Sequence, residues 1–274
     1  MRVSAAREPQ PTFRDRFGPW ALIAGASAGL GAEYANQAAA RGLNLFLVAR
    51  RIELLGPLAA RLAAAHGVEV RISACDLARP DLVSFLTGET AGLEIGLLVC
   101  SAGYSVIGPF LERPLTDHLL EIDTNCRAPV ALAHTYGQGM AERGRGGIIL
   151  MSSLSANQGS PLIANYGATK AYNLLLAEGL WYELRKRGVA VLACRAGATA
   201  TPNYLGSLQE QGAGRGAPSM SPARVVAETL AALSRGPSVI PGRGNRLAAF
   251  FMQRLLPRRT AVLLMGRVLQ GIYG

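Results

Sequence analysis

Lysine is almost absent from this chain of 274 residues, in which Lys170 and Lys186 stand beside 26 arginines. Cysteine is also scarce: none of the four cysteines belongs to a CxxC pair, and we expect all four to be reduced and mostly buried. No His, Cys or carboxylate cluster has the spacing of metal ligands, so no metal site is predicted. No apolar run approaches the roughly 18 residues needed to cross a bilayer, and the first residues lack the apolar core of a signal peptide. These absences favour a soluble cytoplasmic protein.

Acidic residues are outnumbered, 18 against 28 basic ones, which gives a formal net charge of +10. Such an excess can indicate a nucleic acid or an anionic membrane as the partner. The arginines are scattered among Ala and Gly, however, and no recognition motif or aromatic-basic platform accompanies them. We therefore predict no nucleic-acid partner.

The apolar residues, half of the chain, are arranged in alternating β-rich runs and helical stretches. Several of the β-rich runs are almost wholly apolar, as in parallel strands that are covered on both faces. Strands are predicted at residues 20–24, 43–48, 69–73, 95–100, 147–151, 189–194 and 238–240, and helices at 30–41, 52–66, 81–90, 116–143, 166–187 and 222–235. No Pro-rich or Ser-rich linker divides the chain. The sequence thus predicts a solvated arm at 1–17 and a single α/β domain at 18–242, with a doubly wound, Rossmann-like parallel sheet and helices on both faces.

Two segments do not fit this alternation. Residues 203–221 are rich in glycine and poor in core anchors, which predicts a mobile loop, or lid, over a site. Residues 243–274 mix apolar clusters with arginines. This basic tail is expected to form amphipathic helices that pack on the domain or on a sister subunit; docking on an anionic membrane surface is the less favoured alternative.

A glycine-rich turn follows the first predicted strand. The run AGASAGLG at 24–31 contains Gly25, Gly29 and Gly31, which allow an anionic group to approach the backbone amides at the start of the next helix. After the first strand of an alternating chain, this turn predicts a dinucleotide site. A tight turn without a ligand is the alternative.

The end of the second predicted strand indicates which dinucleotide is bound. An acidic residue there would hold the ribose hydroxyls of NAD, whereas this chain has Arg50 and Arg51. A guanidinium suits a 2′-phosphate by charge and by its forked donors. We therefore predict NADP(H) over NAD(H), with solvated arginines at a helix start as the alternative.

The reactive end is indicated by one of the two lysines. Tyr166 and Lys170 are four residues apart and therefore share one face of a helix. To exchange protons readily at neutral pH, the phenol would have to be acidified by about three pKa units, or roughly 4 kcal/mol. The ammonium and the helix start are expected to act in that direction. Ser153, just after a predicted strand, can come beside Tyr166 and hold a substrate oxygen.

These motifs together resemble the short-chain dehydrogenase/reductase family over about residues 18–240. The matching pieces are AGASAGLG, CDL at 75–77, SAG at 101–103, TNC around Asn125, MSS ending at Ser153, YGATK at 166–170 and GATATP at 197–202. The resemblance implies hydride transfer between a nicotinamide cofactor and a carbonyl or alcohol, with a homodimer or homotetramer as the assembly.

The resemblance also implies roles for single residues. Tyr166 would be the general acid/base, Lys170 would tune it and hold the nicotinamide ribose, and Ser153 would orient the substrate. Asn125 would fix a water molecule that links Lys170 to solvent. The expected cofactor contacts are Gly25, Ser27, Gly29, Leu30, Gly31, Arg50, Arg51, Asp76 at the adenine edge, Leu77, Ser101, Ala102, Gly103, Tyr166, Lys170, Thr199 and Thr201 at the carboxamide.

The chain departs from the family pattern at two places. In the family, a threonine contacts an asparagine of a later asparagine pair. Here Ala24 replaces the threonine and Cys100-Ser101 replaces the pair, which we interpret as a changed structural contact. Arg195 and Ala196 stand where the family often has Cys-Pro before the glycine. The family pattern therefore does not predict the geometry of the cofactor loop that follows them.

The substrate is expected to be a lipophilic carbonyl compound, such as an acyl, aromatic or steroid-like ketone. This follows from the apolar residues in the expected cleft segments 104–115, 154–164 and 203–208. NADPH-dependent reduction is the preferred direction. The alternatives are a catalytically silent NADPH sensor or scaffold, and a membrane-surface lipid reductase docked by the tail.

Overall fold

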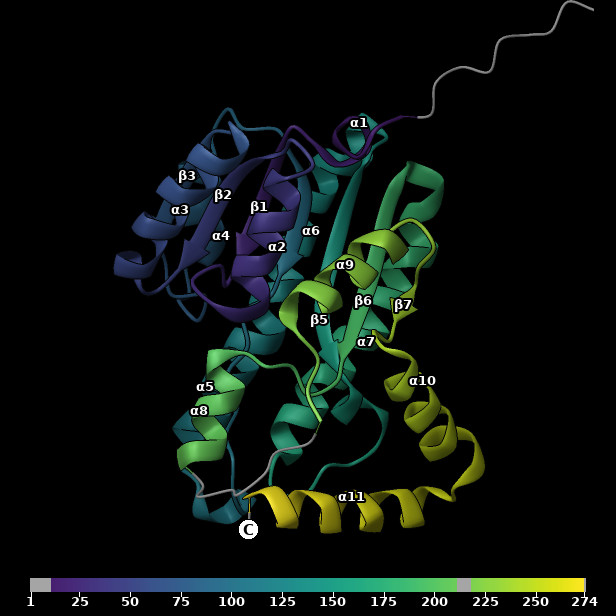
Figure 1. The fold of residues 1–274 in the computed structure, drawn as a ribbon. Coiled ribbons are helices and arrows are strands. Elements are labelled where there is room, and N and C mark those ends of the chain that lie inside the picture. Colours follow the sequence, from purple (N-terminus) through teal and green to yellow (C-terminus); the bar gives the residue numbers. More distant parts are fainter. Residues whose placement is uncertain (1–10, 211–217, 274) are drawn as a thin grey trace, which may run out of the picture.

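A single seven-stranded parallel sheet forms the centre of the molecule in the computed structural model, which describes residues 11–210 and 218–273 (Figure 1). The strand order is β3-β2-β1-β4-β5-β6-β7. The strands are β1 (Trp20–Ala24), β2 (Asn44–Ala49), β3 (Val70–Ala74), β4 (Ile95–Cys100), β5 (Gly146–Ser153), β6 (Val189–Ala196) and β7 (Ser238–Val239). The predicted fold class and all seven predicted strands are confirmed. The order reverses between β1 and β4, which is where parallel sheets of this kind bind ligands.

Helices cover both faces of the sheet. On one face lie α2 (Gly29–Ala39), α3 (Ile52–His66) and α9 (Pro222–Ala232), which pack against one core cluster that contains Tyr34, Leu55 and Val226. On the other lie α4 (Leu82–Glu89), α6 (Ala128–Arg143) and α7 (Ala164–Leu184), which pack against a second cluster that contains Leu86 and Leu132. The five central strands are almost wholly buried on both faces, as their apolar composition predicts, whereas the edge strands β3 and β7 are partly exposed.

The long helix predicted at 116–143 is interrupted. It consists of α5 (Leu115–Ile122), a π-helical turn η2 (Asp123–Arg127) and α6. Such turns often occur at functional sites because they shift the register of one side chain. Here the π turn contains Asn125, which is completely buried.

Two segments are more regular than predicted. The N-terminal arm was expected to be solvated, but α1 (Phe13–Phe17) is a helix, and its last residue, Phe17, is buried against the sheet. Thr12 and Asp15 form a capping box that stabilises its start. The expected loop at 203–221 begins instead with α8 (Pro202–Glu210). Residues 1–10 of the arm and 211–217 of the expected lid lie outside the described residues, so mobility of the lid stays a prediction.

The tail forms two helices on the domain. They are α10 (Arg243–Phe250), which ends in a π turn, η5 (Phe251–Leu255), and α11 (Arg258–Tyr273). In Figure 1, α11 lies across one end of the molecule, with its last turn beneath α5 and α8. Within the described residues, no helix is both long and apolar enough to span a membrane.

Candidate active site

The glycine-rich turn between β1 and α2 packs tightly against the loop that follows β4. Gly25 has φ +91°, and a Cβ atom there would collide with the backbone of Ala102. A Cβ atom on Gly31 would overlap the carbonyl oxygen of Gly25. Only glycine fits at these two positions, and the bare backbone at the start of α2 is left facing a cavity. The turn therefore has the form that a dinucleotide phosphate requires.

The cavity has a volume of about 920 Å³ and is lined by every cofactor residue that the sequence predicts. Arg50 and Arg51 are exposed at its rim, after β2, and the Arg51 guanidinium donates to the Ser27 hydroxyl over 3.3 Å. The other predicted residues that line it are Gly25, Gly29, Leu30, Gly31, Asp76, Leu77, Ser101, Ala102, Gly103, Ser153, Tyr166, Lys170, Thr199 and Thr201. Of the predicted catalytic residues, Asn125 alone does not line the cavity.

Backbone hydrogen bonds form the contact between the ends of β1 and β4, where the chain departs from the family pattern. The amides of Ser101 and Ala102 both donate to the carbonyl of Ala24 over 2.8 Å. Ala24 and Cys100 are buried in the same apolar cluster. The Ser101 hydroxyl, which lines the cavity, is buried without a hydrogen-bond partner among the described residues. A buried hydroxyl of this kind suits a polar group of a bound dinucleotide.

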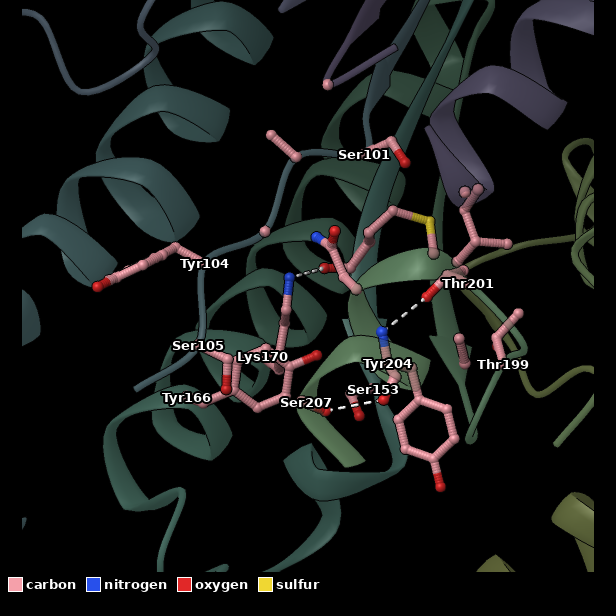
Figure 2. Close-up of a pocket in the computed structure, with 18 of the residues that line it drawn as sticks. Ser101, Tyr104, Ser105, Ser153, Tyr166, Lys170, Thr199, Thr201, Tyr204 and Ser207 are labelled. Carbon is pink, nitrogen blue, oxygen red and sulfur yellow. Dashed lines mark hydrogen bonds between the residues drawn. The ribbon is translucent and has the colours of Figure 1, made fainter. Parts of the chain in front are cut away.

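Ser153, Tyr166 and Lys170 converge on one wall of the cavity (Figure 2). Ser153 ends β5; its hydroxyl accepts from the Ser155 amide over 3.2 Å and acts to lower the pKa of the Tyr166 phenol. Lys170 is buried one turn further along α7, with its Nζ atom 5.4 Å from the centroid of the Tyr166 ring. The Nζ atom donates to the carbonyl of Met151 over 3.2 Å.

The phenol is less acidic than the sequence suggests. Burial, which outweighs the lowering effect of the Ser153 hydroxyl, raises the pKa of Tyr166 to about 12. Burial likewise lowers the pKa of Lys170 to about 8. The predicted acidification of Tyr166 by Lys170 is therefore wrong for the protein alone, because desolvation of the phenolate dominates and the ammonium is directed at Met151. At neutral pH the phenol keeps its proton.

Asn125 lies behind the cavity and fixes its wall. Its side-chain amide accepts from the Tyr104 amide over 2.9 Å and donates to the Tyr104 carbonyl over 2.8 Å and to the Thr169 hydroxyl. Asn173, which the sequence left without a role, donates to the carbonyls of Asn125 and Met151. These two amides connect the π turn, α7 and β5, and they hold in place the loop that begins at Tyr104.

Comparison with known proteins agrees with this geometry. Residues 19–211 match the family model of the short chain dehydrogenases. This chain is a short-chain dehydrogenase. The family comprises oxidoreductases that act on CH–OH and C=O groups with a nicotinamide cofactor, so the predicted family and enzyme class are confirmed.

Several relatives of the dehydrogenase are named for hydroxysteroids or for very-long-chain 3-oxoacyl-CoA. A 7β-hydroxysteroid dehydrogenase of Collinsella aerofaciens is 31% identical over 236 residues, which cover 85% of this chain and 90% of the relative. A very-long-chain 3-oxoacyl-CoA reductase of Bos taurus is 32% identical over 64% of this chain and 57% of its own length. A solved 7β-hydroxysteroid dehydrogenase structure superposes with a TM-score of 0.87 at 29% identity, covering 93% of this chain and 99% of the other. An NADPH complex from Sphingobium yanoikuyae has a TM-score of 0.76 at 30% identity, over 87% and 94% of the two chains.

The remaining walls of the cavity come from the segments that were predicted to line a substrate cleft and from the tail. All three predicted cleft segments contribute, through residues such as Ser105, Ile163 and Tyr204. Sequence reasoning missed the contribution of α11. Its lining side chains are Met265, Val268, Leu269, Ile272 and Tyr273. Their spacing of three or four residues is the signal that could have identified a face of α11 directed at a ligand.

Arg195, one of the two departures from the family pattern, holds the tail indirectly. Its guanidinium donates to the side-chain oxygen of Asn157, whose own carbonyl accepts from Arg258 at the start of α11. Asn157 ends the short 3₁₀ helix η3 (Leu154–Asn157) that follows Ser153. The replacement of Cys-Pro by Arg-Ala therefore connects the cofactor loop to the tail helix that covers the cavity.

Proposed function

We propose that this dehydrogenase reduces a ketone or aldehyde group of a lipophilic small molecule with NADPH, and that Tyr166 is its general acid/base. The observation that carries the proposal is the convergence of Ser153, Tyr166 and Lys170 on a cavity with a glycine-lined turn and an apolar helix, α11. Bound NADPH would supply the hydride to the carbonyl carbon.

The side chains supply the rest of the chemistry. The Ser153 hydroxyl would donate to the substrate oxygen and hold it beside the phenol. As hydride reaches the carbon, negative charge develops on that oxygen, and the Tyr166 phenol gives it a proton. The Lys170 ammonium would stabilise the phenolate that remains. Because the raised pKa of Tyr166 keeps the phenol protonated at neutral pH, the free protein already carries the proton that reduction consumes.

The preference for NADPH rests on charge. Arg50 and Arg51 stand at the rim of the cavity, and no acidic residue occupies the end of β2. Two guanidinium groups favour a 2′-phosphate, whereas an aspartate or glutamate there would repel it. Neighbours solved with NADPH support this choice.

The proposed substrate class rests on the apolar wall that α11 contributes to the cavity. Met265, Leu269 and Ile272 of α11 present apolar side chains opposite a few hydroxyl groups. Relatives named for hydroxysteroids and for very-long-chain 3-oxoacyl-CoA support a bulky, lipophilic carbonyl compound. A homo-oligomeric assembly and a cytoplasmic location stay predictions.

The test is NADPH oxidation, followed by absorbance, across a panel of steroid ketones, 3-oxoacyl thioesters and small water-soluble ketones. We expect turnover with at least one lipophilic member and turnover about a thousandfold slower by Tyr166→Phe. Binding of NADPH without turnover on any member would contradict the proposal and favour the sensor alternative.

A further inference from the structure

The two tail helices carry many exposed side chains that do not pack in the core of the domain. Their exposed apolar side chains are Leu247, Phe250, Phe251, Leu255, Leu263 and Leu264. Their exposed basic side chains are Arg243, Arg246, Arg254, Arg258, Arg259 and Arg267. We call this set the tail surface. Exposed leucines and phenylalanines that are interspersed with arginines are typical of helices that lie in a membrane interface.

Most of the charge of the tail surface is not neutralised by ion pairs among the described residues. Residues 243–274 contain six arginines and no acidic residue, and therefore account for more than half of the net charge of +10. Among the ion pairs of the described residues, only that of Arg246 with Glu228 involves the tail. The other five arginines leave their charge available to a partner.

Helix α11 is apolar on two faces. Met265, Leu269 and Ile272 line the substrate cavity. On the other face, Leu263 and Leu264 are 57% and 42% exposed. A surface helix of a globular protein needs only one apolar face to pack on its core. The outer face therefore requires an explanation other than packing within the domain.

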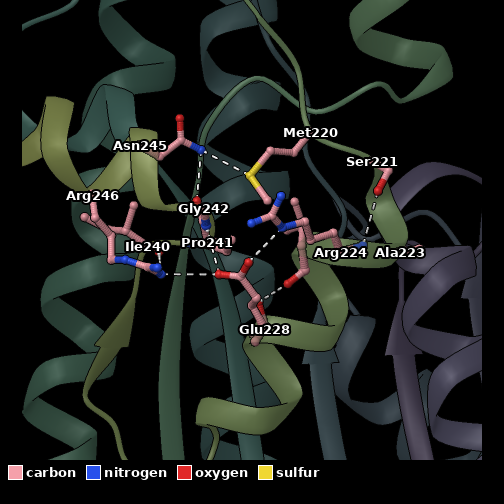
Figure 3. Close-up of polar contacts among 12 residues, drawn as sticks. Met220, Ser221, Ala223, Arg224, Glu228, Ile240, Pro241, Gly242, Asn245 and Arg246 are labelled. Carbon is pink, nitrogen blue, oxygen red and sulfur yellow. Dashed lines mark hydrogen bonds and ion pairs between the residues drawn. The ribbon is translucent and has the colours of Figure 1, made fainter.

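The tail surface is held firmly by the domain. At the start of α10, the Glu228 carboxylate accepts from the Gly242 amide over 2.9 Å and pairs with Arg224 and Arg246 (Figure 3). At the start of α11, Arg258 donates to the carbonyl of Asn157 over 2.5 Å. Both helices are thus anchored where they begin, and the exposed side chains are presented by an ordered element.

We propose that the tail surface docks this dehydrogenase on an anionic lipid membrane. The leucines and phenylalanines would enter the interface and the arginines would pair with lipid phosphates. A second copy of the chain fits less well, because a symmetric tail-to-tail contact would bring six arginines against six. The inference rests on the proposed function: a lipophilic substrate dissolved in the membrane would reach the cavity beside α11.

Vesicle co-sedimentation of the full-length protein tests the proposal without measuring activity. The vesicles are phosphatidylcholine alone and phosphatidylcholine with about one third phosphatidylglycerol. We expect binding to the anionic vesicles only, and weaker binding at high salt because the charges are screened. No pelleting with either vesicle, or equal pelleting with both, would overturn the proposal.

Two double variants and two matched controls locate the surface. Arg254→Glu/Arg259→Glu and Phe250→Ser/Phe251→Ser should each weaken binding by about tenfold or more. The controls Arg61→Glu/Arg235→Glu and Leu54→Ser/Val83→Ser change exposed side chains elsewhere to the same extent and should bind as the parent does. Equal binding by all variants would overturn the proposal.

Two further measurements distinguish membrane docking from a contact with a second copy of the chain and from the proposed reductase activity. Size-exclusion chromatography shows whether the tail variants alter the oligomeric state; a shift to smaller species without vesicle binding by the parent would mean that a second copy covers the tail surface. Turnover of a water-soluble ketone should be unchanged in the tail variants, because none of their side chains lines the cavity. The membrane proposal and the proposed reductase activity can therefore fail independently.

Discussion

At the scale of single residues, Tyr166 is the side chain on which the proposed chemistry depends most. Replacing it with phenylalanine removes the proton donor but keeps the ring that packs in the cavity wall. We expect Tyr166→Phe to lower kcat by about a thousandfold, within the usual range for a lost general acid. Ketone-dependent loss of NADPH absorbance measures this. Fluorescence titration with NADPH should give a Kd close to that of the parent, and a variant that keeps a tenth of the activity would contradict the role.

Arg50 tests the cofactor preference. Arg50→Asp replaces a donor for the 2′-phosphate with a repelling charge, so the Kd for NADPH should rise by about tenfold or more. The Kd for NADH, which lacks that phosphate, should change little or fall. Arg61→Asp, on the exposed side of α3, is the matched control and should leave both constants unchanged. Equal weakening of NADPH binding and NADH binding would contradict the assignment of Arg50 to the 2′-phosphate.

The residue scale also shows what sequence patterns can and cannot predict. The spacing of Tyr166 and Lys170 placed both on one wall of the cavity, because helical periodicity is a local property. The pKa of Tyr166 could not be predicted, since it depends on how closely the surrounding protein excludes water. The part of Asn173 in supporting Asn125 was equally hidden, because it is a contact between residues 48 positions apart.

At the scale of helices and strands, α11 forms an apolar part of the cavity wall where we propose that the substrate binds. Leu269 lines the cavity and is 7% exposed, so Leu269→Ser should raise the KM for a bulky lipophilic ketone by about tenfold, as expected for loss of a buried leucine contact. The KM for a small water-soluble ketone should hardly change. Leu263→Ser, on the outer face of the same helix, is the control. Similar effects of both variants on both substrates would mean that the helix is merely destabilised.

The Glu228 carboxylate of α9 holds the start of α10 in place. The Gly242 amide and the guanidinium groups of Arg224 and Arg246 keep the pKa of Glu228 below its usual value. A carboxylate whose pKa is depressed in the folded state stabilises the protein above its unfolded-state pKa, and this stabilisation is lost as pH falls through the folded-state value. We expect Glu228→Gln to cost about 1 kcal/mol of unfolding free energy at pH 7.

Denaturant unfolding at several pH values checks this expectation. The difference between parent and Glu228→Gln should shrink in acid, where the parent carboxyl becomes protonated as well. Glu33→Gln is a suitable control, because its carboxylate forms no ion pair among the described residues. A difference that is constant with pH would show that the effect is not electrostatic.

Elements differ in how well the sequence predicts them. The five central strands were predictable because parallel strands that are buried on both faces are almost continuously apolar. Helix α8 was not, because its glycine-containing sequence has few core residues, and its side chains face the cavity instead. The tail helices were predicted, but not their place, since which face a helix packs against depends on the finished domain.

At the scale of the whole molecule, α7 leaves an apolar stripe uncovered. Tyr172, Leu175 and Tyr182 are 42%, 66% and 64% exposed, while Leu174 on the same helix is buried. An exposed apolar stripe of this kind is typical of a contact with a second subunit, and the homo-oligomer that the family resemblance implies stays a prediction. Leu175→Asp should shift the protein to a smaller species in light scattering, whereas Leu54→Asp on α3 should not. A parent that is already monomeric would exclude the predicted oligomer.

The two lysines also differ across the molecule: Lys170 is buried near the start of α7, and Lys186 is exposed in η4 (Arg185–Arg187) just beyond its end. Reagents that acylate amines would therefore find one accessible lysine side chain, that of Lys186, which does not line the cavity. Coupling to an amine-reactive support or a fluorophore would be close to site-specific without any engineering. Enzyme immobilised in this way would keep its substrate opening turned away from the matrix.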